Sequence, residues 1–166
     1  MLKPAVFLDR DGVINKEKGF VHKISDFEWI EGSIECIKFL NNNNYHVFVI
    51  TNQSGIARGF YSEKDVIYLH KFINKELEKN NAHIDEFFIS PYHPDFPEKF
   101  NNLAHFRKPD IGMLELEEKK WLIKKNKSFL IGDRKSDILC ANKFGIKGYL
   151  FKGGNLLNFV KKIQII

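Results

Sequence analysis

The sequence predicts an α/β fold, a doubly wound (Rossmann-like) parallel sheet of five strands with helices on both faces. Two observations predict it. Five short apolar runs, rich in β-branched and aromatic residues, alternate with segments whose apolar residues recur at the helical period. The runs are apolar throughout, as expected for strands that are covered on both faces. Alternating strands and helices form right-handed βαβ units, which place the carboxyl ends of the strands at one sheet edge.

The pattern gives each element in turn. Strands are expected over residues 4–8, 46–50, 86–89, 128–131 and 147–151. Helices are expected over residues 33–40, 63–79, 113–123, 134–144 and 156–163. Gly145 follows the fourth helix, where glycine favours a helix end. No large cap domain fits between these elements, so residues 1–166 are expected to form one domain.

Composition sets the broad class. The chain is 43% hydrophobic and 28% charged, as ordinary soluble proteins are. Its net charge of +5 favours anionic partners, although much of the excess lies in lysine runs typical of solvated helix faces. Cys36 and Cys140 lie among apolar neighbours and are expected to be buried thiols.

The chain carries no pattern typical of membrane insertion or export. No apolar run reaches the roughly 18 residues that span a bilayer, and a strand is expected to begin almost at the first residue. We therefore expect no signal peptide, no membrane partner and a cytoplasmic location. We also expect the protein to be a monomer.

Polar residues gather where the expected strands end. Asp and Thr side chains follow three of the strands, and a lysine precedes the third helix: Asp9, Asp11, Thr51, Lys108, Asp133 and Asp137. Each could be an ordinary loop residue, because such residue types form turns. Their shared location at the edge where such folds bind ligands indicates a site instead.

The chemistry that fits this set is phosphoryl transfer. Asp9 would attack phosphorus and form an aspartyl-phosphate. Asp11 would protonate the leaving oxygen and then accept a proton from the hydrolytic water. Thr51 would donate a hydrogen bond to the phosphoryl oxygens, and Lys108 would supply positive charge to them.

The carboxylates also predict a metal site. Carboxylate oxygens are suited to a hard cation such as Mg²⁺, which would screen Asp9 as it approaches a phosphate dianion. Asp133 would complete the metal site. Asp137, one helical turn later, would orient that site or its water from outside.

Four segments resemble the motifs of the haloacid dehalogenase superfamily of phosphatases, in the same order along the chain. They are residues 6–13, Thr51, residues 108–109 and residues 132–137. The resemblance implies that Asp9 is the nucleophile and Asp11 the acid and base. It also implies that Mg²⁺ is held by Asp9, by the backbone carbonyl of Asp11, and by Asp133.

Residues 7–15, 19–21, 51–59 and 107–109 are further similar to the heptose-bisphosphate and histidinol-phosphate phosphatases. The resemblance implies a phosphorylated sugar as substrate, with loss of the 7-phosphate of D-glycero-D-manno-heptose 1,7-bisphosphate in heptose and lipopolysaccharide biosynthesis. The substrate contacts expected from it are Arg10, Glu17, Lys18, Gly19, Phe20, Asn52, Gln53, Ser54, Arg58, Arg107 and Arg134.

One segment departs from that family. Its members usually carry a zinc loop, with the pattern Cys-x-His and then Cys-x-Cys, before the Arg-Lys-Pro sequence. Ser90, Tyr92, Ala104 and Phe106 stand at those places here. Because zinc sites of this kind depend on thiolate ligands, we expect no structural zinc and a loop packed by its own aromatic residues.

Other classes fit less well. A receiver module would carry its phosphoacceptor Asp after the third strand, where this chain has Ile89 and Ser90. A nucleoside triphosphatase would need a phosphate-binding glycine loop, which the sequence lacks. Histidinol phosphate and a nucleic-acid 3′-phosphate stay open as substrates, but no basic patch with interleaved aromatic residues indicates a nucleic-acid partner.

Overall fold

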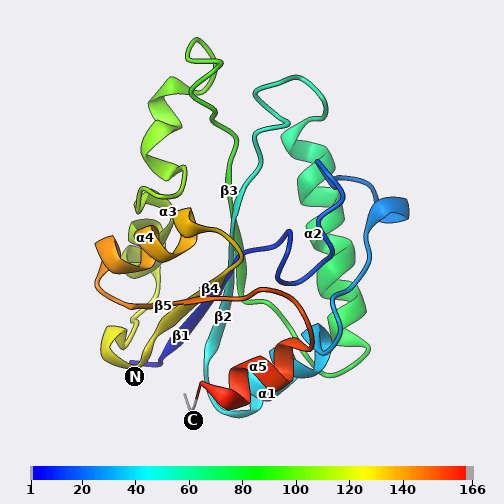
Figure 1. Ribbon diagram of the computed structural model, residues 1–166, viewed down its shortest axis with the longest axis vertical. Helices are drawn as coiled ribbons and strands as arrows, with labels where there is room; N and C mark the ends of the chain where they lie inside the picture. The colour runs from blue at the N-terminus through cyan, green and yellow to red at the C-terminus, as the bar shows by residue number, and fades with distance from the viewer. Residues whose placement is uncertain (1, 164–166) are drawn as a thin grey trace.

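The computed structural model describes residues 2–163, which build a five-stranded parallel sheet between two layers of helices (Figure 1). The strand order is β3-β2-β1-β4-β5, and each neighbouring pair is parallel. The strands are β1 (Ala5–Leu8), β2 (His46–Asn52), β3 (Glu86–Ser90), β4 (Phe129–Gly132) and β5 (Lys147–Leu150). This arrangement confirms the predicted fold class.

The two faces of the sheet bury different helices, because successive strand residues point to opposite sides. On one face lie α1 (Ser33–Asn42), α2 (Glu63–Glu78) and α5 (Leu156–Lys162). On the other lie α3 (Gly112–Lys120) and α4 (Lys135–Phe144). In β1, Val6 and Leu8 face the first layer, whereas Phe7 faces the second. Each such fully buried side chain contributes roughly 1.5–3 kcal/mol to folding.

Most element boundaries agree with the prediction to within two residues, but the third helix is shorter than expected. It ends at Lys120 and not at residue 123. Trp121 turns away and donates a hydrogen bond from Nε1 to Glu86 Oε2 at 3.0 Å. Ile123 pairs with Lys3 in an isolated bridge. The apolar residues that suggested a longer helix therefore serve tertiary contacts.

Short 3-10 turns complete the chain at η1 (Ile24–Asp26), η2 (Asn101–Phe106) and η3 (Lys125–Lys127). Cys36 and Cys140 are buried free thiols, as predicted. Every helix within residues 2–163 is too short or too polar to cross a bilayer.

The strand order creates a switch point between β1 and β4. The chain runs outward from β1 to β3 and then returns to add β4 and β5 on the other side of β1. Leu8 pairs with Ile131, and the Asp9 amide donates to Ile131 O at 3.0 Å. Asp9 and Asp133 therefore follow the ends of adjacent strands, at the point where open α/β sheets bind their ligands.

Candidate active site

A cavity of about 700 Å³ opens at this carboxyl edge. Its base is formed around the ends of β1 and β4. We call this base the floor, and it comprises Asp9, Asp11, Lys108, Asp133 and Asp137. Residues of the surrounding loops line the rest of the cavity. We call them the outer wall, which comprises Glu17, Phe20, Arg58, His93, Arg107 and Arg134.

Lys108 is the buried cation at the centre of the floor. Its Nζ lies 3.0 Å from Asp9 Oδ1 and 2.6 Å from Asp137 Oδ1, and it donates to Ile50 O at 2.9 Å. Asn52 holds the lysine backbone on both sides, since its side chain bonds Lys108 N and Lys108 O at 3.0 Å each. Burial by itself lowers the pKa of Lys108, but Asp9 and Asp137 outweigh burial and raise it. The lysine is therefore charged.

Asp9 is buried among other carboxylates. Its Oδ1 accepts a hydrogen bond from the Arg10 amide at 2.8 Å. Burial raises its pKa to about 7; Lys108 acts in the opposite direction, and Asp137 and Asp11 add to the rise. A second positive charge beside Asp9 would therefore favour its carboxylate form.

The floor fits a hard divalent cation. Asp9, Asp133 and Asp137 each offer an oxygen within 4.8 Å of the others. Asp133 Oδ1 is buried and has no hydrogen-bond partner among residues 2–163. Gly12, at φ +88°, lies so close that a Cβ there would stand 2.3 Å from Asp133 Oδ2. A glycine is thus needed for Asp133 to reach the cluster, and the oxygen donors match those that Mg²⁺ prefers.

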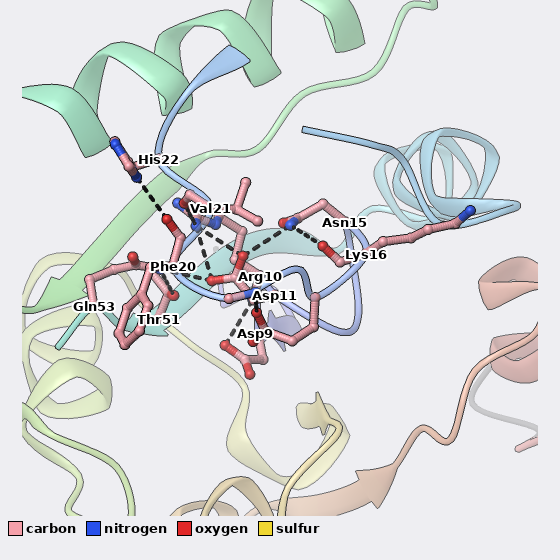
Figure 2. A network of polar contacts seen from close by, with 12 residues as sticks. Asp9, Arg10, Asp11, Asn15, Lys16, Phe20, Val21, His22, Thr51 and Gln53 are labelled. Atoms are coloured by element: carbon pink, nitrogen blue, oxygen red, sulfur yellow. Dashed lines mark hydrogen bonds and ion pairs between the residues drawn. The ribbon is translucent and has the colours of Figure 1, made fainter. Parts of the chain in front are cut away.

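Asp11 is held by three side chains (Figure 2). Arg10 Nη2 donates to its two oxygens at 2.9 and 3.0 Å. Asn15 Nδ2 donates to Oδ1, and Gln53 Nε2 donates to Oδ2, both at 2.9 Å. The orientation of this carboxylate is therefore fixed before any ligand arrives.

Arg10 lies beneath the cavity and not in it. Its side chain is fully buried, and it also donates to Val21 O and lies 3.2 Å from His70 Nε2. His70 stacks on Phe87 at 4.3 Å. Burial, followed by the charge of Arg10, lowers the pKa of His70 well below its usual value, so this histidine is neutral. The Arg10 guanidinium is used to hold Asp11, and a contact of Arg10 with substrate stays a prediction.

The outer wall brings three arginines together. The Arg58 guanidinium lies over the rings of Phe20 and Phe96, at 5.9 and 5.3 Å, and its Nε is buried without a partner among residues 2–163. Arg134 lies 3.4 Å from Glu17 Oε2. Burial, and then the charges of Arg134 and Arg58, lower the pKa of Arg107. The wall therefore holds more positive charge than its own acids balance.

Comparison with known proteins identifies the family. The family model described as "Polynucleotide kinase 3 phosphatase" matches residues 5–147. D-glycero-beta-D-manno-heptose-1,7-bisphosphate 7-phosphatase of Rhodopseudomonas palustris is 40% identical over 164 residues, which are 98% of this chain and 91% of that protein. This chain belongs to the haloacid dehalogenase superfamily of phosphatases. The predicted family and the predicted enzyme class, a phosphatase, are thereby confirmed.

Two further relatives of this phosphatase bear on its site. D-glycero-alpha-D-manno-heptose-1,7-bisphosphate 7-phosphatase of Photorhabdus laumondii is 41% identical over 152 residues, 90% of this chain and 82% of that one. The crystal structure of D,D-heptose 1,7-bisphosphate phosphatase from B. bronchiseptica, complexed with magnesium and phosphate, superposes with a TM-score of 0.81. It is 26% identical and covers 96% of this chain and 86% of that one.

Most residues predicted for the pocket of this phosphatase line the cavity. They are Glu17, Gly19, Phe20, Asn52, Gln53, Ser54, Arg58, Arg107 and Arg134. Lys18 is not among the lining residues, and its Nζ pairs with Glu28 Oε2 at 2.9 Å on the surface. The contact of Lys18 with substrate stays a prediction. Thr51 is buried beside the cavity, where its Oγ1 accepts from Gln53 Nε2 at 2.8 Å.

Sequence reasoning missed Tyr61 and His93 in this phosphatase, which both line the cavity. His93 Nε2 lies 3.2 Å from Arg58 Nη2, so the histidine belongs to the wall. Tyr61 comes two residues after the 51–59 segment, and this position was the only sequence signal for it. Its hydroxyl donates to Gln53 Oε1 at 2.6 Å.

Side-chain contacts anchor the loop that departs from the zinc pattern of this family. Lys99 Nζ donates to Ala57 O at 3.2 Å, and Arg107 Nη1 donates to Tyr92 O at 3.2 Å. Within residues 2–163, the single carboxylate cluster of the floor is the group found with metal-ligand spacing. The expected lack of zinc stays a prediction.

Proposed function

We propose that this phosphatase removes the 7-phosphate of D-glycero-D-manno-heptose 1,7-bisphosphate, with Mg²⁺ and an aspartyl-phosphate on Asp9. The observation that carries the proposal is the pairing of a carboxylate floor around Lys108 with a wall of three arginines. The names of the relatives, which include both the alpha and the beta anomer, support this substrate. The proposal covers the 7-phosphate of either anomer.

The first step takes place on the floor. Asp9, the backbone carbonyl of Asp11, and Asp133 would hold Mg²⁺, which supplies the charge that lets a carboxylate approach a phosphate dianion. An Asp9 oxygen bonds to phosphorus while the bond from phosphorus to the sugar oxygen breaks. Lys108 neutralises charge on the phosphoryl oxygens, and Asp137, 2.6 Å from its Nζ, keeps it in place.

Asp11 carries the protons in both halves of the reaction. In the first half its carboxylic acid protonates the departing sugar oxygen. In the second half its carboxylate accepts a proton from the water that attacks phosphorus, and Asp9 is released. Thr51 donates a hydrogen bond from its hydroxyl group to a phosphoryl oxygen in both steps. The two carboxylates thereby divide nucleophilic and proton-transfer work between them.

The wall would bind the second phosphate. Arg58, Arg107 and Arg134 line the cavity, and the acids beside them are Glu17 and Asp95. A charge-assisted hydrogen bond to such a phosphate is worth roughly 1.5–3 kcal/mol, or about tenfold to a hundredfold in specificity. Histidinol phosphate would present an ammonium group to these arginines and is disfavoured.

A nucleic-acid 3′-phosphate is the second candidate, because the matching family model is described as a polynucleotide 3′-phosphatase. Such a substrate also carries additional phosphates that the arginines could bind. The 40% identity to proteins named for heptose bisphosphate, over 98% of this chain, favours the sugar.

The test is a comparison of kcat/KM for three substrates with Mg²⁺ present. They are the heptose bisphosphate, histidinol phosphate and a 3′-phosphorylated oligonucleotide. We expect the bisphosphate to exceed histidinol phosphate by at least about tenfold, with phosphate released from the 7-position. Equal or better turnover of either alternative would overturn the substrate assignment and leave the phosphatase chemistry in place.

A further inference from the structure

We infer that Tyr61 is a positioning residue whose hydroxyl fixes the amide of Gln53, and that this amide orients both Asp11 and Thr51 for phosphoryl transfer. The inference rests on the proposed roles of Asp11 and Thr51. It assigns a task to a tyrosine outside the four motif segments, and it predicts that Tyr61 acts only through Gln53.

Gln53 lies at the centre of this arrangement. Its Nε2 donates one hydrogen to Asp11 Oδ2 at 2.9 Å and the other to Thr51 Oγ1 at 2.8 Å. Figure 2 shows Thr51 and Gln53 beside Asp11. A 180° turn of the amide would place Oε1 against the Asp11 carboxylate, which offers only acceptors when ionised. Asp11 therefore selects one of the two amide orientations.

Tyr61 holds that orientation from the other end. Its hydroxyl donates to Gln53 Oε1 at 2.6 Å. With this bond, all three polar contacts of the amide are satisfied: Asp11 Oδ2 and Thr51 Oγ1 accept its two N–H groups, and the Tyr61 hydroxyl donates to its oxygen. Without the Tyr61 hydroxyl, the amide oxygen would be left unpaired in a nearly buried position, and its orientation would be less well defined.

The consequence for Thr51 is specific. Its Oγ1 accepts the Gln53 N–H, so its own hydroxyl hydrogen is free to point elsewhere. The proposed reaction needs this hydrogen on a phosphoryl oxygen. For Asp11, the consequence is that Oδ2 accepts two hydrogen bonds, one from the neutral Gln53 amide and one from Arg10. The Gln53 bond therefore helps to fix the orientation of the carboxylate. One amide thus sets the direction of two reacting groups.

The position of Tyr61 is itself rigid. Its ring packs on Gly55 so closely that a Cβ there would stand 2.1 Å from Tyr61 Cε1. On the other side it stacks on His22, with ring centroids 4.4 Å apart and planes 14° from parallel. Ser62, the next residue, is the N-cap of α2. Burial raises the pKa of Tyr61 to about 12, so its hydroxyl stays a donor at neutral pH.

The test compares two leaving groups. Tyr61→Phe removes the hydroxyl and keeps the ring, whereas Tyr68→Phe removes an exposed hydroxyl on α2 and is the matched control. The substrates are the heptose bisphosphate, whose sugar oxygen must be protonated, and p-nitrophenyl phosphate, whose phenolate leaves without an acid. We expect Tyr61→Phe to lower kcat on the sugar about threefold to tenfold. KM should change by less than about twofold. The p-nitrophenyl rate, which depends on Thr51 but needs no acid, should fall less than the rate on the sugar, and Tyr68→Phe should match wild type.

A double variant tests whether Tyr61 acts through Gln53. Gln53→Glu replaces the N–H donors with a carboxylate beside Asp11 and should lower kcat on the sugar more than Tyr61→Phe does. Adding Tyr61→Phe to Gln53→Glu should cause no further loss, since the two residues share one pathway. Additive losses, equal losses on both substrates, or no loss in Tyr61→Phe would each overturn the inference.

The role of Asp11 is checked in the same assay. Asp11→Asn should show the same leaving-group pattern with a larger loss. If Asp11→Asn instead slows both substrates equally, the acid role in the proposed function fails. A failure limited to Tyr61→Phe would leave that role standing and remove only the present inference.

Discussion

The floor and the outer wall of the cavity are built differently. On the floor, Asp9, Lys108 and Asp137 are buried, and Lys108 lies at ion-pair distance from both carboxylates. On the wall, residues such as Arg134 are exposed, and three arginines have two neighbouring acids: Glu17, 3.4 Å from Arg134, and Asp95, 3.8 Å from Arg58. The difference indicates that the positions of the floor side chains are fixed before a ligand binds, whereas the arginines of the wall can still bind an anionic group of the ligand.

We therefore expect the floor to carry out phosphoryl transfer and the wall to determine which substrates bind well. Changes to Asp9, Lys108 or Asp133 should lower kcat on every substrate, because these groups would bind the reacting phosphoryl group or its metal in the proposed mechanism. Changes to the wall should lower kcat/KM only for substrates that carry a second anion.

The largest effect is expected for Asp9→Asn. An amide cannot act as the nucleophile, so kcat should fall by at least about 10³-fold on the bisphosphate and on p-nitrophenyl phosphate alike. Asp26→Asn, which alters an exposed aspartate in η1, is the matched control and should retain wild-type turnover. Phosphate release is measured for folded protein, checked by circular dichroism. Substantial turnover by Asp9→Asn would contradict the covalent mechanism.

Removal of divalent metal should come next in size. The oxygens of Asp9, Asp133 and Asp137, with the unpartnered Asp133 Oδ1, leave a position for a hard cation. Excess chelator should lower kcat by at least about a hundredfold, and added Mg²⁺ should restore it. Full turnover in chelator would show that the floor works without metal.

The aspartates of the floor were predictable because they follow strand ends in local motifs. Asp9 and Asp133 needed only the strand pattern and the parallel topology to be placed side by side, and the structure does so. Arg10 shows the limit of this reasoning. A charge next to the nucleophile suggests a ligand contact, but Val21 and His70 come from distant segments to enclose it.

The wall could be predicted only in part, because its members meet through loops. Nothing local to Lys18 shows that Glu28 will draw it away from the cavity. Likewise, His93 reaches Arg58 across 35 residues of sequence. Such contacts depend on how the loops 15–31 and 90–106 fold over the sheet edge, which strand and helix periodicity does not determine.

The wall is tested by Arg107→Ala against Lys18→Ala. Loss of one charge-assisted contact should lower kcat/KM for the bisphosphate about tenfold to a hundredfold. Heptose 7-phosphate, which lacks the second phosphate, should lose less than about threefold. Lys18→Ala removes a cation of the 15–31 loop that pairs with Glu28, and it should leave both values unchanged. Equal losses on the two sugars would indicate that Arg107 serves the reacting phosphate and belongs with the floor.

The smallest effect concerns stability. In the metal-free protein, burial and neighbouring carboxylates raise the pKa of Asp9 from 3.8 to about 7. Between about pH 4 and 7 the folded state therefore holds a proton that the unfolded chain has lost. Stability contributed by this group falls as pH rises through that window. Above the window Asp9 is ionised, and the repulsion within the floor is largest.

Bound Mg²⁺ should offset that loss, so the increase in Tm that it causes should grow with pH. Because about 1 kcal/mol corresponds to roughly 2–4 °C for a chain of this size, we expect the increase to be at least about 2 °C larger at pH 7.5 than at pH 5. Thermal melts with and without saturating Mg²⁺ at the two pH values measure it. Asp9→Asn, which has no carboxylate to titrate, should show a smaller pH dependence. An equal increase at both pH values would mean that protonation of Asp9 is not linked to the metal site.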